Sequence, residues 1–200
     1  MENRFDKYAR EWESNPGRIE ISEKILKSLL KKVSLNHNMK VLDYGAGTGL
    51  ISLALSDSVG SVIAMDTSKG MLEVLTEKIA AAKVKNILPV FCNLETQDYS
   101  EMFNLIVISM ALHHIKDYTK LITKFNHLLS ENGSLVIVDL ETEDGSFHPD
   151  KTGVYYNGFD KRDLKQKLID VGFCKVSVTR AFGFSRNDKH FDIFIAVSQV

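Results

Sequence analysis

The sequence lacks the features that mark several large classes of protein. Cysteine occurs only at Cys92 and Cys174, which form no C-x-x-C pair, so we expect reduced, buried thiols and no metal site. No apolar run approaches the ~18 residues of a membrane span, and no signal-peptide pattern begins the chain. The net charge is -1, without the basic excess of nucleic-acid-binding domains. These absences predict a cytoplasmic protein with neither a membrane nor a nucleic acid as partner.

Length and composition bound the fold. The chain has 200 residues, of which 44% are hydrophobic and 26% charged, so it can bury a full α/β core. We expect a single domain over residues 1–200. Its N-terminal part, residues 1–35, is expected to be a helical lid, and residues 36–200 are expected to form the core.

The stretch from Lys40 to Leu50, KVLDYGAGTGL, carries the main motif. It begins as a buried strand that ends at Asp43, and Gly45, Gly47 and Gly49 follow at alternate positions before a helix. Alternating glycines allow a tight turn and let a ligand approach the backbone closely, while a helix start offers unpaired N–H groups. The pattern predicts a nucleotide-type pocket rather than a plain strand-to-helix turn.

A second strand, residues 61–65, ends at Asp66, which lies 21 residues after Gly45. An acid at this distance from a glycine turn suits the binding of ribose hydroxyls, because a carboxylate accepts both hydroxyl protons. The alternative is a helix N-cap, since Thr67 and Ser68 follow.

Strand-like and helix-like segments alternate over residues 40–139, which predicts a parallel sheet covered by helices on both faces. Ligands bind such sheets at the carboxyl ends of the strands. Pro89 argues that its strand lies at the edge, because proline lacks the N–H that a ladder needs. The residues expected at the ligand-binding ends are Asp43, Asp66, Asn93, Ser109 and Asp139.

Three further segments complete the chain. Phe5, Tyr8 and Trp12 are spaced by three and four residues, so their rings share one helical face that either packs on the core or closes over a ligand. Residues 141–158 form a loop long enough to be functional. A closing pair of strands, residues 174–179 and 191–198, makes the sheet mixed.

Five segments of the sequence now resemble class I S-adenosylmethionine (SAM)-dependent methyltransferases of the small-molecule type. They are VLDYGAGTGL, VIAMDTSKGML, FNLIVISMALHHI, LLSENGSLVIVD and GFDKRDLKQKLIDVGF. The resemblance implies a Rossmann-like three-layer α/β sandwich with a mostly parallel seven-stranded sheet and a C-terminal antiparallel hairpin. It also implies transfer of a methyl group from SAM to an acceptor, for which we expect a small molecule, with a protein or a tRNA as the alternatives.

The resemblance further implies a set of SAM-binding residues. The glycines line the methionine part, Asp43 orients the turn, and Asp66 holds the ribose hydroxyls. The family often has an acid at position 93, where this chain has an asparagine whose amide oxygen can still accept. The full set is Tyr8, Trp12, Asp43, Gly45, Ala46, Gly47, Gly49, Asp66, Thr67, Met71, Asn93, Leu94, Ser109 and Met110.

Methyl transfer needs a general base only if the acceptor atom is protonated, and histidine suits that role. The catalytic candidates are His114 and His148, with His113 beside them. Packing at a helix start also explains the His113–His114 pair, and a plain loop residue explains His148. The oligomeric state, monomer or homodimer, stays open.

Two other functions remain possible. An NAD-dependent oxidoreductase also has a glycine turn and an acid, but here Leu50 occupies the position of the last glycine in G-x-G-x-x-G. A non-catalytic SAM-binding or regulatory protein would keep the same fold. Binding of NADH without SAM would favour the first, and SAM binding without methyl transfer the second.

Overall fold

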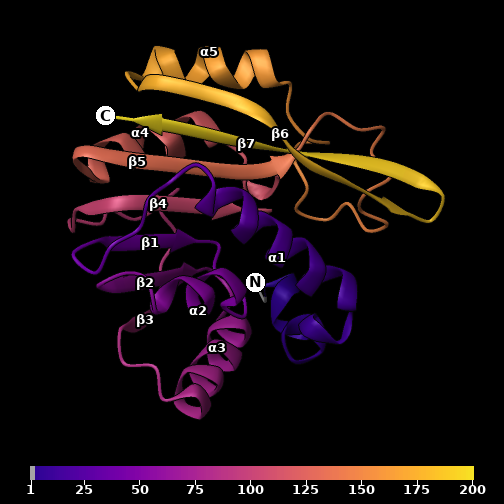
Figure 1. The fold of residues 1–200 in the computed structure, drawn as a ribbon. Coiled ribbons are helices and arrows are strands. Elements are labelled where there is room, and N and C mark those ends of the chain that lie inside the picture. Colours follow the sequence, from indigo (N-terminus) through magenta and orange to yellow (C-terminus); the bar gives the residue numbers. More distant parts are fainter. Residues whose placement is uncertain (1–2) are drawn as a thin grey trace. The chain divides into compact units, whose positions relative to one another are not determined.

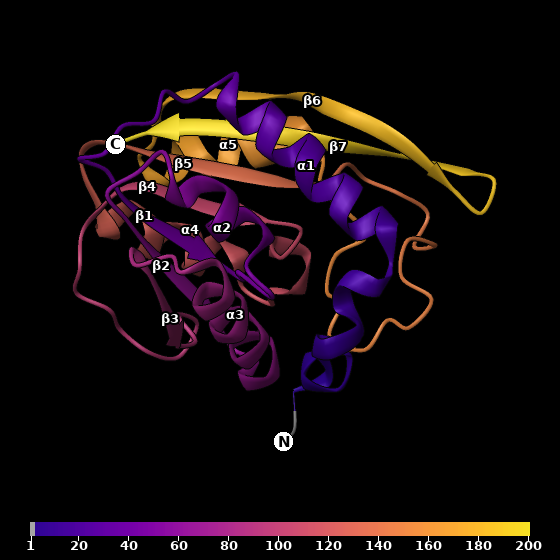
Figure 2. The same ribbon diagram turned by 60° about the horizontal axis from the view of Figure 1, so that its bottom comes forward.

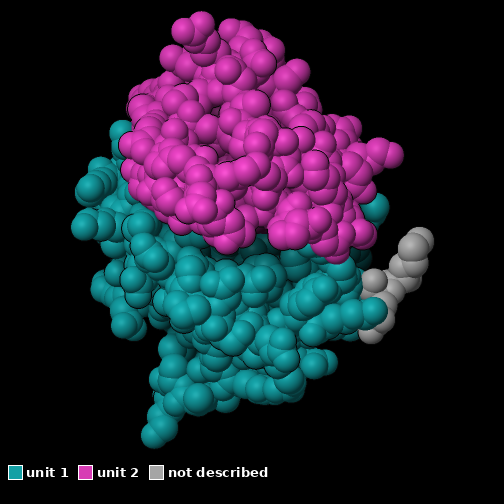
Figure 3. All heavy atoms as spheres, turned by 90° about the vertical axis from the view of Figure 1, so that its right-hand side faces the viewer, with its two compact units in different colours: residues 1–98 teal, residues 99–200 magenta. Residues whose placement is uncertain are grey.

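The computed structural model describes residues 3–200, which fall into two compact units. Unit 1 comprises residues 1–98 and unit 2 residues 99–200 (Figure 3). The expectation of one domain over the whole chain stays a prediction.

Unit 1 contains the predicted alternation of strands and helices (Figure 1). Its parallel strands run in the order β3-β2-β1, with Leu42 opposite Ile63 and Ile63 opposite Leu88. The edge position expected for the strand with Pro89 is confirmed. The elements are η1 (Arg4–Ser14), α1 (Pro16–Leu30), β1 (Lys40–Tyr44), α2 (Leu50–Ser56), β2 (Ser61–Asp66), α3 (Lys69–Ala82) and β3 (Ile87–Phe91).

Unit 2 contains strands in the order β4-β5-β7-β6. β4 is parallel to β5, whereas β7 is antiparallel to both β5 and β6. The elements are β4 (Phe103–Ser109), η2 (Leu112–His114), α4 (Tyr118–Leu128), β5 (Leu129–Leu140), α5 (Lys161–Val171), β6 (Cys174–Arg186) and β7 (Lys189–Gln199).

The strands that the sequence predicts as buried form the cores of the two units. Val41 and Leu42 of β1 are inaccessible to solvent, as are all residues from Leu105 to Ile108 of β4. The seven strands, mostly parallel and ending in an antiparallel hairpin, confirm the predicted fold class. Among the described residues, no helix has both the length and the apolar character needed to cross a membrane.

Two strand boundaries differ from expectation. Glu131-Asn132-Gly133 has the composition of a turn that closes a helix, but β5 already begins at Leu129, and Asn132 has a left-handed φ of 61° within it. Phe103 pairs with Leu129 while Leu105 pairs with Ser134, so the intervening residues of β5 bulge outward. The hairpin is also longer than expected, because β6 and β7 continue to a two-residue turn at Asn187–Asp188, where φ is 51° and 59°.

The predictions for the N-terminal segment and for the cysteines also differ from the structure in part. η1 is a 3₁₀ helix, and α1 follows it directly, with Asn15 as its N-cap and Pro16 in its first turn. Cys92 and Cys174 form no disulfide. Cys92 is buried as predicted, but Cys174 is exposed, contrary to the expectation.

Candidate functional site

The glycine turn in unit 1 joins β1 to α2 through three left-handed residues. The φ angles of Gly45, Gly47 and Gly49 are 74°, 55° and 81°, a conformation that side chains strongly disfavour. A Cβ on Gly49 would lie 2.2 Å from Cδ1 of the buried Leu75, so α3 packs directly on the turn. A Cβ on Gly47 would meet no atom within 4 Å. Gly49 thus allows α3 to pack against the turn, and Gly47 borders open space that a ligand can enter.

Asp66 ends β2 and reaches back to the glycine turn. Its Oδ2 accepts a 2.7 Å hydrogen bond from the N–H of Gly47, and its Oδ1 accepts a 2.8 Å hydrogen bond from the N–H of Ser68. Burial raises the pKa of Asp66, an effect that these N–H donors oppose. Ser68, not Asp66, is the N-cap of α3, because its hydroxyl accepts from the N–H of Met71. A carboxylate offers about four acceptor positions, so Asp66 can still accept from a ligand.

Asp43 lies beneath the turn at the end of β1 and is completely desolvated. Its Oδ2 accepts a 2.6 Å hydrogen bond from the hydroxyl of Ser52, on the first turn of α2. Burial raises the pKa of Asp43 to about 6, the Ser52 hydroxyl opposes the shift, and the negative charge of Asp66 adds to it. A ligand with a positive charge would relieve the unfavourable ionisation of both carboxylates.

The N-terminal segment, residues 3–14, is fastened to the start of α3, and we call it the N-terminal clamp. Oδ1 of Asp6 accepts from the hydroxyl of Ser68 at 2.6 Å and from the N–H of Gly70 at 2.9 Å. The amide of Asn3 donates to the carbonyl oxygen of Thr67 at 2.9 Å. A Cβ on Gly70 would lie 3.0 Å from the backbone of Asp6, so this glycine permits the close approach. The clamp therefore contacts the residues that directly follow Asp66.

Further contacts continue the clamp along α3, and Figure 2 shows the indigo N-terminal segment beside that helix. The guanidinium of Arg10 pairs with both carboxylate oxygens of Glu77, at 2.9 and 3.2 Å. Glu13 accepts from Nζ of Lys78 at 2.6 Å, and Lys78 also donates to the carbonyl oxygen of Thr48 in the glycine turn. The helical lid predicted for this region thus has contacts to both α3 and the turn.

The three aromatic side chains of the clamp, Phe5, Tyr8 and Trp12, do not share one environment. Phe5 and Trp12 meet edge to face with centroids 5.9 Å apart, and the guanidinium of Arg18 lies 3.8 Å from the centroid of Trp12. Tyr8 is 48% exposed. Tyr8 and Trp12 therefore differ in surroundings, and their predicted contact with a ligand stays a prediction.

The other predicted residues of unit 1 lie in the glycine turn, after β3 and in α3. Ala46 is in the turn, and its N–H donates to the carbonyl oxygen of Met65. Asn93 follows β3 in a tight turn, where its side-chain oxygen accepts from the N–H of Glu95 at 2.9 Å. Met71 and Leu94 are buried in the core of unit 1.

In unit 2 the end of β4 is irregular. Ser109 is its last residue, and Met110 follows with a left-handed φ of 51°. The N–H of Met110 donates to the carbonyl oxygen of Val138 in β5, which holds this strained residue in place. A strained residue at a strand end is a common feature of functional sites, and Ser109 and Met110 are both half-buried.

His113 directly follows this strand end and is bound to β5. Its Nδ1 lies 2.6 Å from Oδ1 of Asp139, and both side chains are buried. Asp139 also accepts from the N–H groups of His113 and Leu140. Since several donors converge on Asp139, its carboxylate is the acceptor and Nδ1 of His113 carries the proton, which leaves Nε2 as a lone-pair donor.

His148 and His114 lie against His113. Nε2 of His148 is 2.9 Å from Nε2 of His113, and Nδ1 of His114 is 2.7 Å from the carbonyl oxygen of Gly153. The ring centroid of His113 lies 4.1 Å from that of His114 and 4.9 Å from that of His148. The structure therefore brings both catalytic candidates together on one buried histidine.

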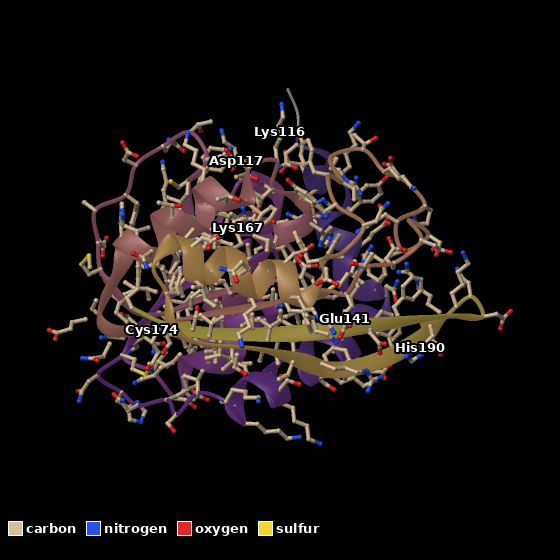
Figure 4. The ribbon with its side chains drawn as sticks, turned by 90° about the horizontal axis from the view of Figure 1, so that it is seen from above. Lys116, Asp117, Glu141, Lys167, Cys174 and His190 are labelled. Atoms are coloured by element: carbon tan, nitrogen blue, oxygen red, sulfur yellow. The ribbon has the colours of Figure 1, made fainter. Side chains whose placement is uncertain are left out.

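The 141–158 loop holds its position by hydrogen bonds at several points. The N–H groups of Tyr155 and Tyr156 donate to the carbonyl oxygen of His113, and the hydroxyl of Tyr156 donates to that of Lys116. Glu141, labelled in Figure 4 with Lys116, starts the loop and pairs with Nζ of Lys161 at 2.7 Å. The loop is irregular, as predicted, but well anchored.

Comparison with known proteins now decides the family. A profile described as a methyltransferase domain matches residues 17–186 of the chain. The chain belongs to this methyltransferase family. The match confirms the predicted membership of a methyltransferase family. The open space at Gly47 and the two carboxylates beside it fit a cationic nucleoside such as SAM.

The relatives of this methyltransferase include an uncharacterised methyltransferase of Schizosaccharomyces pombe, 34% identical over 135 residues, which are 60% of this chain and 48% of that protein. A demethylmenaquinone methyltransferase of Shouchella clausii is 33% identical over 117 residues, 56% of this chain and 50% of that protein. The chain spans about half the length of these curated relatives. A SAM-dependent methyltransferase of Aquifex aeolicus has the same fold, with a TM-score of 0.72, 20% identity and 98% coverage of both chains.

The sequence alone did not identify several residues that contact the site. Asp6, which fastens the clamp, and Ser52, which binds Asp43, contact residues distant in sequence, and no local pattern marks them. Asp139 was expected at a strand end but without a role. An acid at the end of a buried strand, with two histidines after the neighbouring strand, is the signal that the sequence offers for the Asp139–His113 contact.

Proposed function

We propose that this methyltransferase transfers the methyl group of SAM to a small-molecule acceptor. The observation that carries the proposal is the open glycine turn at Gly47, with the carboxylates of Asp66 and Asp43 beside it. Carboxylates suit the ribose hydroxyls and the positive charge of SAM, and the absence of a Cβ at Gly47 suits close approach of its methionine tail.

A small-molecule acceptor is supported by the charge and by the relatives. The net charge of -1 gives no electrostatic attraction for nucleic acid. The Shouchella clausii relative is a demethylmenaquinone methyltransferase, and its match to half of that protein is compatible with a similar small acceptor here. Cys174 is an exposed free cysteine, and exposed free thiols suit a reducing compartment such as the cytoplasm.

The chain's own residues would act mainly by positioning. SAM supplies the methyl group and a neutral leaving group, so alignment of the acceptor does most of the catalysis. The acceptor's lone pair forms the new bond to the methyl carbon as the carbon–sulfur bond breaks and sulfur keeps its electron pair. If the acceptor atom carries a proton, His114 and His148 are the candidates to take it.

Titration calorimetry with SAM, S-adenosylhomocysteine and NADH tests the cofactor directly. We expect the first two to bind and NADH not to bind. Incubation with methyl-labelled SAM and a panel of phenols, thiols, amines and quinols then tests transfer, with His148→Gln as a variant expected to lower turnover. NADH binding without SAM would overturn the proposal, and SAM binding without transfer to any acceptor would favour a regulatory role.

A further inference from the structure

Three histidines of unit 2 form a cluster that the proposed reaction does not require as a group. One ring nitrogen from each of His113, His114 and His148 lies within 4.8 Å of the other two. His113 is buried, and the other two are half-buried. Three imidazoles gathered this closely are the donor set of three-histidine metal sites, in which a fourth position is left for water or substrate.

The partners of the outer ring nitrogens support metal binding. A histidine that binds a metal through one nitrogen usually donates its other N–H to a carboxylate or a backbone carbonyl. Nδ1 of His113 lies 2.6 Å from Oδ1 of Asp139, and Nδ1 of His114 lies 2.7 Å from the carbonyl oxygen of Gly153. Both contacts fix the ring orientation and direct Nε2 as the nitrogen that can bind a cation.

The His113–His148 pair needs only a small adjustment to accept an ion, while the ring nitrogens of the whole cluster, which lie within 4.8 Å of one another, must draw closer around it. Zinc–nitrogen bonds of about 2.0–2.1 Å in a tetrahedral site place the nitrogens roughly 3.3 Å apart. Nε2 of His148 now lies 2.9 Å from Nε2 of His113, so a shift of a few tenths of an ångström would open the site. His148 belongs to the 141–158 loop, where Glu143 accepts hydrogen bonds from the N–H groups of Ser146 and Phe147 and so positions the chain just before it.

We propose that His113, His114 and His148 bind a divalent transition-metal ion of the Zn²⁺ type, with Asp139 and the carbonyl of Gly153 as outer partners. Imidazole suits Zn²⁺, Co²⁺ and Ni²⁺, whereas Mg²⁺ and Ca²⁺ prefer oxygen ligands that this set does not supply. A histidine nitrogen binds a metal only when it carries no proton, so the cation would replace the contact between Nε2 of His113 and Nε2 of His148.

The proposal changes the role of the two catalytic candidates, and this part rests on the proposed function. An imidazole nitrogen that binds a cation cannot also accept a proton. The cation would instead lower the pKa of an acceptor hydroxyl or thiol bound at its open position, and the proton would leave to solvent. Methyl transfer would then be lost in the presence of a strong chelator and restored by Zn²⁺ or Co²⁺ but not by Mg²⁺.

Metal titration of the chelator-treated protein, without SAM or acceptor, tests the site independently of activity. We expect one equivalent of Co²⁺ to bind and to give the strong visible absorption of tetrahedral cobalt, and Zn²⁺ to remove that absorption. His148→Ala and His114→Ala should each weaken Zn²⁺ binding by about 100-fold or more. Asp139→Asn should weaken it by about 10- to 100-fold, as expected for an outer partner.

The matched control is His127→Ala. His127 is an exposed histidine in the last turn of α4, nine residues and thus roughly 13 Å along the helix from its start. This variant should bind the metal like the unmodified protein, and thermal melting checks that each variant is folded. Equal Zn²⁺ affinity in the unmodified protein and in His148→Ala and His114→Ala would overturn the site. Methyl transfer that is insensitive to chelator would overturn its catalytic role.

Discussion

The backbone N–H of Gly47 donates a 2.7 Å hydrogen bond to Oδ2 of Asp66. The acid expected to hold the ribose of SAM therefore also fixes the turn expected to hold its methionine part. A change at Asp66 should affect both functions of the turn, which makes it the most informative position in unit 1.

Asp66→Ala should weaken SAM binding by about 1.5–3 kcal/mol, the scale of hydrogen bonds to a charged group, or roughly 10- to 150-fold in Kd. Calorimetric titration measures the change. Asp57→Ala, which removes an exposed acid just after α2, is the control and should bind SAM normally. Unchanged affinity in a folded Asp66→Ala protein would remove this residue from the site.

Alanine should destabilise the protein more at Gly49 than at Gly47, although both glycines have left-handed φ angles. At Gly49 the new Cβ would collide with Leu75 in a packed core, so we expect a loss of about 2–4 kcal/mol in the free energy of unfolding. At Gly47 the Cβ meets no atom, so only backbone strain of about 1–2 kcal/mol is expected.

SAM affinity completes this comparison. Gly47→Ala should lose SAM binding, because its Cβ would occupy the open space of the turn. Urea unfolding and calorimetry on the two variants separate the effects. Normal SAM binding by a folded Gly47→Ala protein would contradict the role of that space.

The pH dependence of stability should report on Asp43. Burial raises its pKa to about 6 from the ordinary value of 3.8, so the folded state binds more protons than the unfolded state between these values. The free energy of unfolding should therefore fall as pH rises from about 4 to about 6, by at most about 3 kcal/mol. Urea unfolding across this range measures the slope.

Asp43→Asn should remove that contribution, since an amide does not titrate in this window while its oxygen can still accept from Ser52. SAM should also bind more weakly below pH 6 in the unmodified protein, because its positive charge favours the ionised carboxylate. The same slope in both proteins would show that Asp43 does not titrate there.

Release of the N-terminal clamp should speed the dissociation of SAM. Asp6→Ala removes the acceptor of two hydrogen bonds at the start of α3, and Gly70→Ala places a Cβ 3.0 Å from the backbone of Asp6. We expect roughly 5- to 30-fold faster dissociation in each variant, from a loss of about 1–2 kcal/mol. Stopped-flow fluorescence of Trp12, which lies within the clamp, follows the rate.

Glu77→Gln is the control for the clamp. It weakens the pair with Arg10, whose side chain is 70% exposed, and exposed pairs contribute about 1 kcal/mol or less. Its dissociation rate should stay close to that of the unmodified protein. Equal rates in all three variants would show that the clamp does not retain SAM.

The sequence predicted most strands and helices of the two units because their patterns are local. Buried strands such as β4 are nearly continuous apolar runs, and Gly172 ends α5 with a φ of 105°, as a helix C-terminal glycine should. The start of β5 was missed because Glu131-Asn132-Gly133 has the composition of a turn, whereas pairing with β4 keeps it in the strand.

The site was predicted in outline but not in its contacts. The glycine turn and Asp66 form a motif with fixed spacing, so sequence alone identified them. The contacts of Asp6 with Ser68 and of His148 with His113 join residues 62 and 35 positions apart, and periodicity carries no information about such pairs. The histidine cluster therefore became visible only when the fold brought its three members together.

Pro89 has a consequence for how this protein behaves at high concentration. It lies in β3 opposite Ala64, at the edge of the sheet in unit 1, and the same strand exposes Leu88 and Phe91. An exposed apolar edge strand invites another chain to pair with it, but a proline interrupts the row of N–H donors that such pairing needs. Replacement of Pro89 by valine should therefore promote edge-to-edge aggregation, visible as light scattering.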